Sequence, residues 1–122
     1  MSNGARIETS TFGRGNSGAV RVTSDAIAID TGEFVGRPSG ISSQVEDRAV
    51  GNSGGVDVTT TNLNLTNGGR IASNTGGEGN LGSVNIIARE NITFDGRRLS
   101  DILSSGVASR VDGNGIGNSG GV

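Results

Sequence analysis

A Gly-Asn-x-Gly tetrad occurs four times in this chain, and its spacing constrains the fold more than any other feature of the sequence. The tetrads start 36, 28 and 38 residues apart, at Gly15, Gly51, Gly79 and Gly117. Each tetrad leads into a new alternation of apolar and polar residues. Recurrence at such a period is typical of solenoids, in which each repeat stacks on the next. The tetrads therefore predict a repeat architecture with turns in equivalent places.

The repeats alternate in length and combine into a longer unit. Ser2–Ile7 matches Thr66–Ile71 at an offset of 64 residues, and Ser39–Ser43 matches Ser105–Ser109 at an offset of 66. Because this duplication covers nearly the whole chain, we expect a single solenoid module over residues 1–122. The expected coils are a partial one at 1–18, then 19–54, 55–82 and 83–120, with 121–122 opening the next.

The composition favours a thin core over a large one. Only 31% of the residues are hydrophobic and 2% are aromatic, whereas 23 residues are glycine. Values this low approach those of disordered chains, but the few Val, Ile and Leu residues recur in register, which a disordered segment has no reason to do. A narrow core between stacked layers needs less apolar material than the centre of a globule. We therefore expect an ordered chain without a large central core.

The ionisable residues exclude several classes of function. The net charge is −2, and all ten basic residues are arginine, with no lysine, histidine or cysteine. Nucleic-acid binding is disfavoured, because it needs a basic excess and aromatic side chains on which bases stack. The lack of histidine and cysteine removes most zinc, copper, haem and thiol chemistry, so we expect no cofactor and no metal. No apolar run approaches the roughly 18 residues of a membrane span, and no signal peptide is visible.

Alternation at period two marks three short extended pieces in each coil. If each coil forms one rung, equivalent strands stack about 4.8 Å apart and their inward side chains form continuous core ladders. The sequence therefore predicts an all-β parallel β-helix (β-solenoid) of about three and a half coils, with three short strands per coil. The predicted ladders are Val20, Val56, Val84 and Val122 in the first piece, Ile27, Leu63 and Ile92 in the second, and Ile7, Ile41, Ile71 and Val107 in the third.

The tetrads provide structural positions rather than catalytic ones. In stacked coils their asparagines fall into one column, where side-chain amides can hydrogen-bond along the axis. The alternative is that each asparagine only accommodates a left-handed turn. The predicted ladder consists of Asn16, Asn52, Asn80 and Asn118 with Gly18, Gly54, Gly82 and Gly120.

The two longer coils carry inserts between the second and third strands, at 31–38 and 97–104. Such inserts emerge on one side of a solenoid, which is frequently the binding side. The alternative is that their apolar residues fold back and shield an edge of the sheet. The candidate interaction residues are Phe34, Arg37, Arg97, Arg98, Leu99 and Ile102.

We expect no catalytic residues, although parallel β-helices also include enzymes that cleave polysaccharides. Their sites need clustered carboxylates or a basic group over a sugar. The acidic candidates here are Glu46 with Asp47, Glu90 and Asp112, and each lies near an arginine, as solvated surface groups normally do. No acidic pair recurs at stacked positions, so the sequence does not predict a deep acidic groove.

Several motifs together resemble a known family. They are Ser-Asn-Gly-Ala-Arg-Ile at 2–7, Thr-Phe-Gly-Arg-Gly-Asn-Ser-Gly at 11–18, the Val-Arg-Val and Val-Asn-Ile strands, and the insert ending at 38–41. This combination is similar to the repeat region of filamentous-haemagglutinin-like, two-partner-secreted proteins, particularly the large cyanobacterial ones. The resemblance implies a right-handed parallel β-helix, export to the cell surface or medium, and a role as adhesin or extracellular scaffold. Family members usually begin with a signal peptide and a secretion domain, so we expect this chain to be a few repeats of such a protein or a short frame derived from one.

The ends of the chain predict self-association. The sequence starts in a third strand and stops just inside a first strand, and neither end has the polar cap with which solenoids normally finish. Burial of the end faces against neighbours gives head-to-tail contacts that do not close and so generate a fibre. The predicted function is a non-enzymatic structural module of an adhesin or scaffold that forms a homo-oligomer or filament. The alternative is a carbohydrate-binding or polysaccharide-cleaving β-helix domain, with a surface carbohydrate or host surface as partner.

Overall fold

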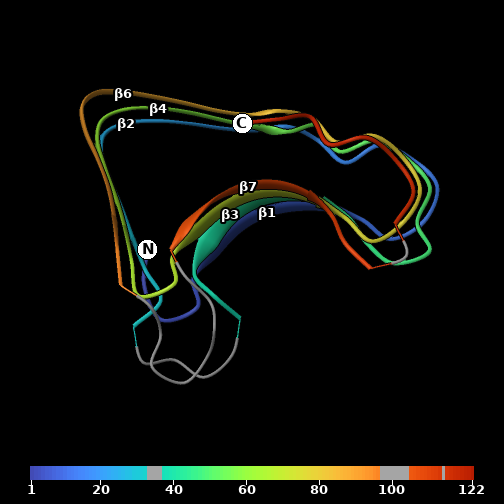
Figure 1. The fold of residues 1–122 in the computed structure, drawn as a ribbon, viewed down its shortest axis with the longest axis horizontal. Helices are drawn as coiled ribbons and strands as arrows, with labels where there is room; N and C mark the ends of the chain where they lie inside the picture. Colours follow the sequence, from blue (N-terminus) through green and yellow to red (C-terminus); the bar gives the residue numbers. More distant parts are fainter. Residues whose placement is uncertain (33–36, 97–104, 114) are drawn as a thin grey trace.

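Parallel β-strands make up the regular structure of the chain. The computed structural model describes residues 1–32, 37–96, 105–113 and 115–122, and these contain no helix. The strands are β1 (Arg6–Thr11), β2 (Val20–Asp30), β3 (Gly40–Val45), β4 (Val56–Thr66), β5 (Arg70–Thr75), β6 (Val84–Asp95) and β7 (Gly106–Val111). They form two sheets, one in the order β1-β3-β5-β7 and one in the order β2-β4-β6 (Figure 1).

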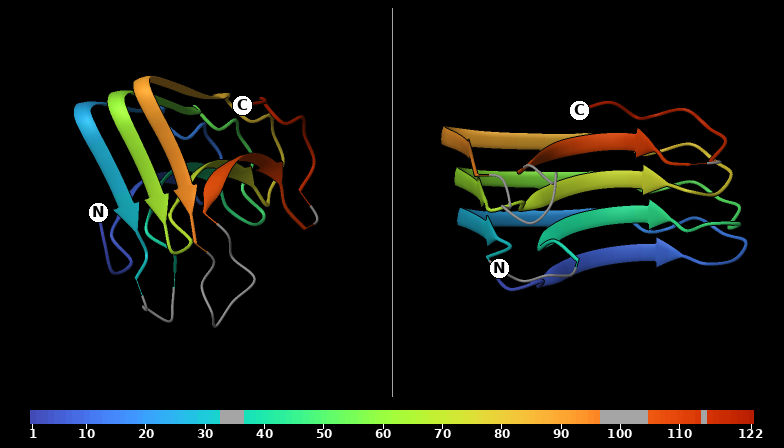
Figure 2. Two further views of the ribbon diagram at one scale, coloured as in Figure 1. Left: turned by 60° about the vertical axis from the view of Figure 1, so that its left-hand side comes forward. Right: turned by 60° about the horizontal axis from the view of Figure 1, so that its bottom comes forward.

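The chain alternates between the two sheets, and each return adds a strand beside the previous strand of that sheet. All the pairings between named strands are parallel. Figure 2 shows the strands of the four-stranded sheet one above another, from β1 at the N-terminal edge to β7 at the C-terminal edge. The prediction of an all-β fold of stacked parallel strands is confirmed, and the arrangement is compatible with a β-helix.

Equivalent residues of the repeats lie in register. Val20 pairs with Val56, which pairs with Val84, and Ile41 pairs with Ile71 in the other sheet. The tetrad turns stack as well, through isolated parallel bridges at Arg14, Val50, Glu78 and Ile116. Most of the difference in repeat length falls between β2 and β3 and between β6 and β7, and the rest lies mainly between β3, β5 or β7 and the following tetrad. The strands therefore stay aligned although the repeats differ in length.

The structure differs from the expected three strands per coil, because the first and second pieces form one continuous strand. Each long strand follows one side of the cross-section and then turns sharply at a corner (Figure 1). At this corner Ser24 Oγ donates to the carbonyl of Ala26 at 3.1 Å, and Thr60 Oγ1 donates to that of Asn62 at 3.0 Å. Thr61, which lies between Thr60 and Asn62, has no partner in the pairing of β4 with β6. Local hydroxyl-to-backbone hydrogen bonds thus support a bend without a loop.

The core is a thin layer between the two sheets. Burying one large aliphatic side chain contributes about 1.5–3 kcal/mol, so a narrow core depends on each layer being covered by the next. Its buried apolar side chains, drawn mostly from the middle of the stack, are Val20, Ile27, Ile29, Ile41, Val56, Val58, Leu63, Leu65, Ile71 and Val84.

Candidate functional site

The tetrad asparagines form a ladder of hydrogen bonds along the stacking direction. Asn16 Oδ1 accepts the backbone N–H of Asn52 at 2.8 Å, and Asn52 Oδ1 accepts that of Asn80 at 2.8 Å. Asn80 Oδ1 accepts the backbone N–H of Asn118 at 3.1 Å. The links therefore join side chain to backbone, whereas we expected side-chain amides to bond to one another. Every link has the same direction, which gives the ladder a polarity.

Glycine, rather than asparagine, takes up the unusual backbone conformation of the tetrads. Gly79 has a φ of +140°, and the non-glycine residues with positive φ in the described part of the chain are Asn3, Arg48 and Asn67. The left-handed-turn alternative therefore does not apply to the tetrad asparagines. A Cβ at Gly79 would overlap the carbonyl oxygen of Gly51 in the neighbouring turn, so a side chain is excluded there. A Cβ would also meet backbone atoms of an adjacent turn at Gly54, Gly82 and Gly120, whereas at Gly18 its nearest neighbour is a side chain.

Next to the asparagine ladder, on the inner side of the tetrad turns, lies a zigzag of buried serine hydroxyls that was not predicted from the sequence. Ser17 Oγ lies 2.9 Å from Ser43 Oγ, which accepts a hydrogen bond from Ser53 Oγ at 3.0 Å. Ser53 Oγ also lies 2.7 Å from Ser73 Oγ. All four residues are buried, so these hydroxyls satisfy one another inside the protein. Leu81 takes the equivalent position in the third tetrad and ends the zigzag.

The predicted core ladders are buried in the middle of the stack, and their members Val20, Ile27 and Val84 are buried on the edge strands as well. Three members differ from the expected burial: Ile7 is 42% exposed, Ile92 is 48% exposed and Val122 is 76% exposed. Ile7 and Ile92 lie on strands with a neighbour on one side only, and Val122 follows the last tetrad. Val107 on β7 is partly buried against the core. The buried members are Val20, Val56, Val84, Ile27, Leu63, Ile41 and Ile71.

The C-terminal edge of the stack contains an open apolar hollow between the sheets. Its volume is about 780 Å³, and Val84, Ile86, Phe94 and Val107 line it. Phe94 is 52% exposed there, although its partner on β4, Leu65, is fully buried. The hollow is therefore the place where a further layer would cover the core.

Two aspartates link neighbouring layers on the outer surface, and both have a lowered pKa. The side-chain amide of Asn67 donates to Asp30 Oδ1 at 2.9 Å, and this hydrogen bond, helped by a backbone amide, lowers the pKa of Asp30. Asn85 Nδ2 donates to Asp57 Oδ1 at 2.9 Å and is the main cause of the lowered pKa of Asp57, with a smaller contribution from Arg21. Hydrogen bonds to the ionised form favour it, so these carboxylates serve as charged inter-layer acceptors.

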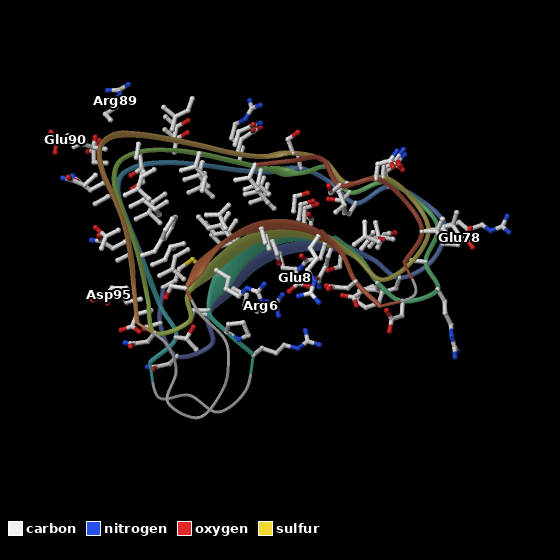
Figure 3. All side chains as sticks on the ribbon, in the orientation of Figure 1. Arg6, Glu8, Glu78, Arg89, Glu90 and Asp95 are labelled. Carbon is white, nitrogen blue, oxygen red and sulfur yellow. The ribbon has the colours of Figure 1, made fainter. Side chains whose placement is uncertain are left out.

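The acidic residues considered for catalysis do not form a cluster. Asp47, which follows β3 together with Glu46, lines a hollow beside Glu78. Figure 3 shows Glu90 far from Glu78, at the outer corner of β6. Asp112 forms an ion pair with Arg110. Within the described residues, no group of three or more acidic side chains is positioned to hold a metal ion.

Most residues of the two inserts lie outside the described residues. Arg37 is exposed just before β3. The other candidate interaction residues, Phe34, Arg97, Arg98, Leu99 and Ile102, lie outside the described residues.

Comparison with known proteins gives no relative for this chain. No protein-family model matches it, and no curated protein or solved structure matches it significantly. The described residues also contain no helix with the length and hydrophobicity needed to span a membrane.

Proposed function

We propose that this chain is a non-enzymatic structural module that stacks end to end with further copies of itself. In this proposal its strands form a right-handed parallel β-solenoid of about three and a half coils, which extends into a filament by stacking. The module belongs to an adhesin or scaffold at the cell surface or in the medium, as the resemblance to filamentous-haemagglutinin-like repeats implies. The stacked layers, not a catalytic group, carry the function.

The observation that carries the proposal is the match between the two edges of the four-stranded sheet. Ile7 on β1 and Val107 on β7 lie in one column with Ile41 and Ile71, which are 1% and 0% exposed. The two outer members are only partly covered. Placing β7 of one copy beside β1 of the next continues the column and covers both, which removes apolar surface from water.

The asparagine ladder supports the same direction of stacking. In the described structure the backbone N–H of Asn16 and the Oδ1 of Asn118 are the two unused ends of the ladder. A donor at one edge and an acceptor at the other fit a head-to-tail contact, which repeats without closing.

The junction is complete in one sheet and incomplete in the other. Ser2 pairs with Asp30, the last residue of β2, so the first two residues of the chain lie beside the C-terminal end of that strand. Val122 stands at the position where a further strand of this sheet would begin, next to the start of β6. The carbonyl of the preceding residue, Gly121, accepts a hydrogen bond from the backbone N–H of Val84. At a junction, Val122 of one copy and Met1 of the next would occupy the two ends of one layer of the three-stranded sheet. The positions between them, which correspond to residues 21–28 of β2, would stay unfilled. The contact between copies therefore relies on the four-stranded sheet and the tetrad turns.

Disulfide trapping tests this contact directly, because the chain has no cysteine. Ser10 and Arg110 lie in one column of the four-stranded sheet, at its two edges. In the proposed stack their Cα atoms lie about 4.8 Å apart across the junction, within the range of about 4.4–6.8 Å that a disulfide accepts. The variant S10C/R110C should form a ladder of linked multimers on a non-reducing gel after mild oxidation.

The matched control is S10C/R89C, whose second cysteine lies at the corner of the other sheet. It should give far fewer linked species at the same protein concentration. Equal linking in the two variants, or monomers only in both, would contradict the proposed contact. The non-enzymatic part of the proposal has its own test, since polysaccharides incubated with the protein should release no new reducing or unsaturated ends.

A further inference from the structure

The outer face of the four-stranded sheet is a hollow rather than a flat solvated surface. The sheet curves toward the core, so the side that carries Arg6 and Glu8 is concave (Figure 3). Ser42 and Ala72 point to this side, yet they are only 6% and 4% exposed. The face contains a cavity of about 190 Å³. We call this cavity and its lining residues the outer trough.

The outer trough has two polar walls and a floor of small side chains. Arg6 and Arg70 form one wall, and Gln44 and Asn74 form the other, four residues further along the strands. Four residues of a strand span about 13 Å, which leaves room for a ligand between the walls. The floor under this space is Ser42 and Ala72, and its column continues to Ala108 on β7 and to Glu8 on β1. Because the floor crosses the strands, it suits an extended polymer lying along the stack.

Each wall contains one residue with a partner and one residue with a group that lacks one in the described structure. Arg6 is neutralised by Glu8, at an N–O distance of 2.6 Å, whereas Arg70 has no carboxylate partner among the described residues. Across the floor, Gln44 Nε2 donates to Glu8 and to Glu46 Oε1, the latter at 2.6 Å, whereas Asn74 Oδ1 is buried and accepts no hydrogen bond. A buried polar atom without a partner calls for an explanation, and a ligand that donates to it is one. The trough thus presents a cation for an anion and an acceptor for a hydroxyl.

The spacing along the stack indicates the repeat of the ligand. Glycine alternates with arginine in the first wall, since the column reads Arg6, Gly40, Arg70 and Gly106. Arginines two layers apart lie about 9.6 Å from each other, which is comparable to an extended disaccharide. Because Arg6 is paired with Glu8, Arg70 is the arginine of this column that can meet a carboxylate of the ligand. We propose that the outer trough binds a linear polysaccharide of uronic acid sugars, with a carboxylate at Arg70 and a hydroxyl donating to Asn74 Oδ1.

Other polymers fit the outer trough less well. The floor is the face of a sheet whose backbone groups are already paired, so a peptide cannot add there as a strand. A single-stranded nucleic acid needs aromatic stacking, and aromatic residues make up only 2% of the chain. The trough lies within one copy, so the inference does not depend on end-to-end stacking.

Calorimetric titration with three tetramers tests the inference: tetragalacturonate as the acidic sugar, maltotetraose as the neutral sugar and tetraglutamate as the acidic peptide. The protein should bind tetragalacturonate and neither of the others. R70Q should weaken this binding about tenfold or more, since a hydrogen bond to a charged group is lost. N74A should weaken it less. R14Q, which removes the same charge from an exposed tetrad turn, should change it less than about twofold.

The inference is overturned if tetragalacturonate does not bind the unaltered protein, if tetraglutamate binds equally well, or if R14Q weakens binding as much as R70Q. Circular dichroism of each variant shows whether the fold is retained. Failure of sugar binding leaves the disulfide ladder of S10C/R110C unaffected, so the two proposals fail separately.

Discussion

Leu63 on β4 and Ile92 on β6 are paired neighbours in the same column, yet only one of them is covered. Leu63 is fully buried, whereas Ile92 is 48% exposed. Both belong to the same alternating pattern and both face the space between the sheets. The difference is that Leu63 has a paired residue on each side, whereas Ile92 has one only in β4 and faces the open hollow on its other side. Val84, also on β6, is fully buried, and its backbone N–H donates to the carbonyl of Gly121 in the last turn. In this fold the burial of a side chain depends on the neighbouring layer, and the centre and the edge of the stack should respond differently to the same substitution.

The largest expected difference is between Leu63→Ala and Ile92→Ala. The first removes a fully buried side chain and should lower the free energy of unfolding by about 2–5 kcal/mol. The second removes a half-exposed side chain next to an open hollow and should cost less than about 1 kcal/mol. Urea unfolding of dilute samples measures both. Equal losses would show that the edge is as well packed as the centre.

The next difference concerns the serine zigzag. Ser53→Ala leaves the buried hydroxyls of Ser43 and Ser73 without their shared partner, which should cost about 1–3 kcal/mol. Ser119 is the exposed equivalent in the last tetrad, and Ser119→Ala should be close to neutral. The same unfolding measurement applies. A neutral Ser53→Ala would mean that the hydroxyls are easily satisfied in other ways.

A smaller effect is expected in the asparagine ladder. Asn52→Ala removes the acceptor for the backbone N–H of Asn80 and should cost about 1 kcal/mol. Asn118→Ala removes an acceptor that serves no N–H within a single copy, so dilute samples should show almost no change. If Asn118→Ala destabilised the dilute protein as much as Asn52→Ala, the polarity of the ladder would be wrong.

The smallest effect is a dependence on pH. The hydrogen bond from Asn67 lowers the pKa of Asp30, so its stabilising contribution is present above the unfolded pKa of about 3.9 and is lost as pH falls through the folded value. Asn67→Gly removes the donor and keeps a residue that tolerates the φ of +49°. Its deficit in stability relative to the parent protein should shrink on acidification below about pH 4. Asn3→Gly, in the equivalent turn at the N-terminal edge, is the control and should show no such trend.

The centre of the stack was predictable from the sequence because its signals are local. Alternation placed Val56, Leu63 and Ile71 inside, and the tetrads placed the turns. The continuous long strand was not predicted, because the bend depends on single hydroxyls such as that of Thr60, which in sequence look like any polar turn residue.

The remaining features depend on partners that are distant in the sequence. Ser17 and Ser43 meet across the interior although they are 26 residues apart, and the only signal was serine recurring in the tetrads and in the small-residue runs. The exposure of Ile92 depends on a missing neighbour rather than on its own strand. The outer trough depends on the curvature of the four-stranded sheet, and no pattern of residues in the sequence predicts that curvature. The sequence did show that Arg6 and Arg70 occupy equivalent positions of the repeat.

Hydrogen exchange at residue resolution, compared between dilute and concentrated samples, tests the central claim most directly. The amides of Val107 and Ser109 face away from β5, because those of Gly106 and Asp112 donate toward it. The account predicts that they exchange rapidly in dilute samples and become protected at high concentration, when β1 of another copy pairs with β7. The amides of Ile71 and Ser73, already between two strands, should be protected in both samples. Exchange at Val107 and Ser109 that does not change with concentration would contradict end-to-end stacking.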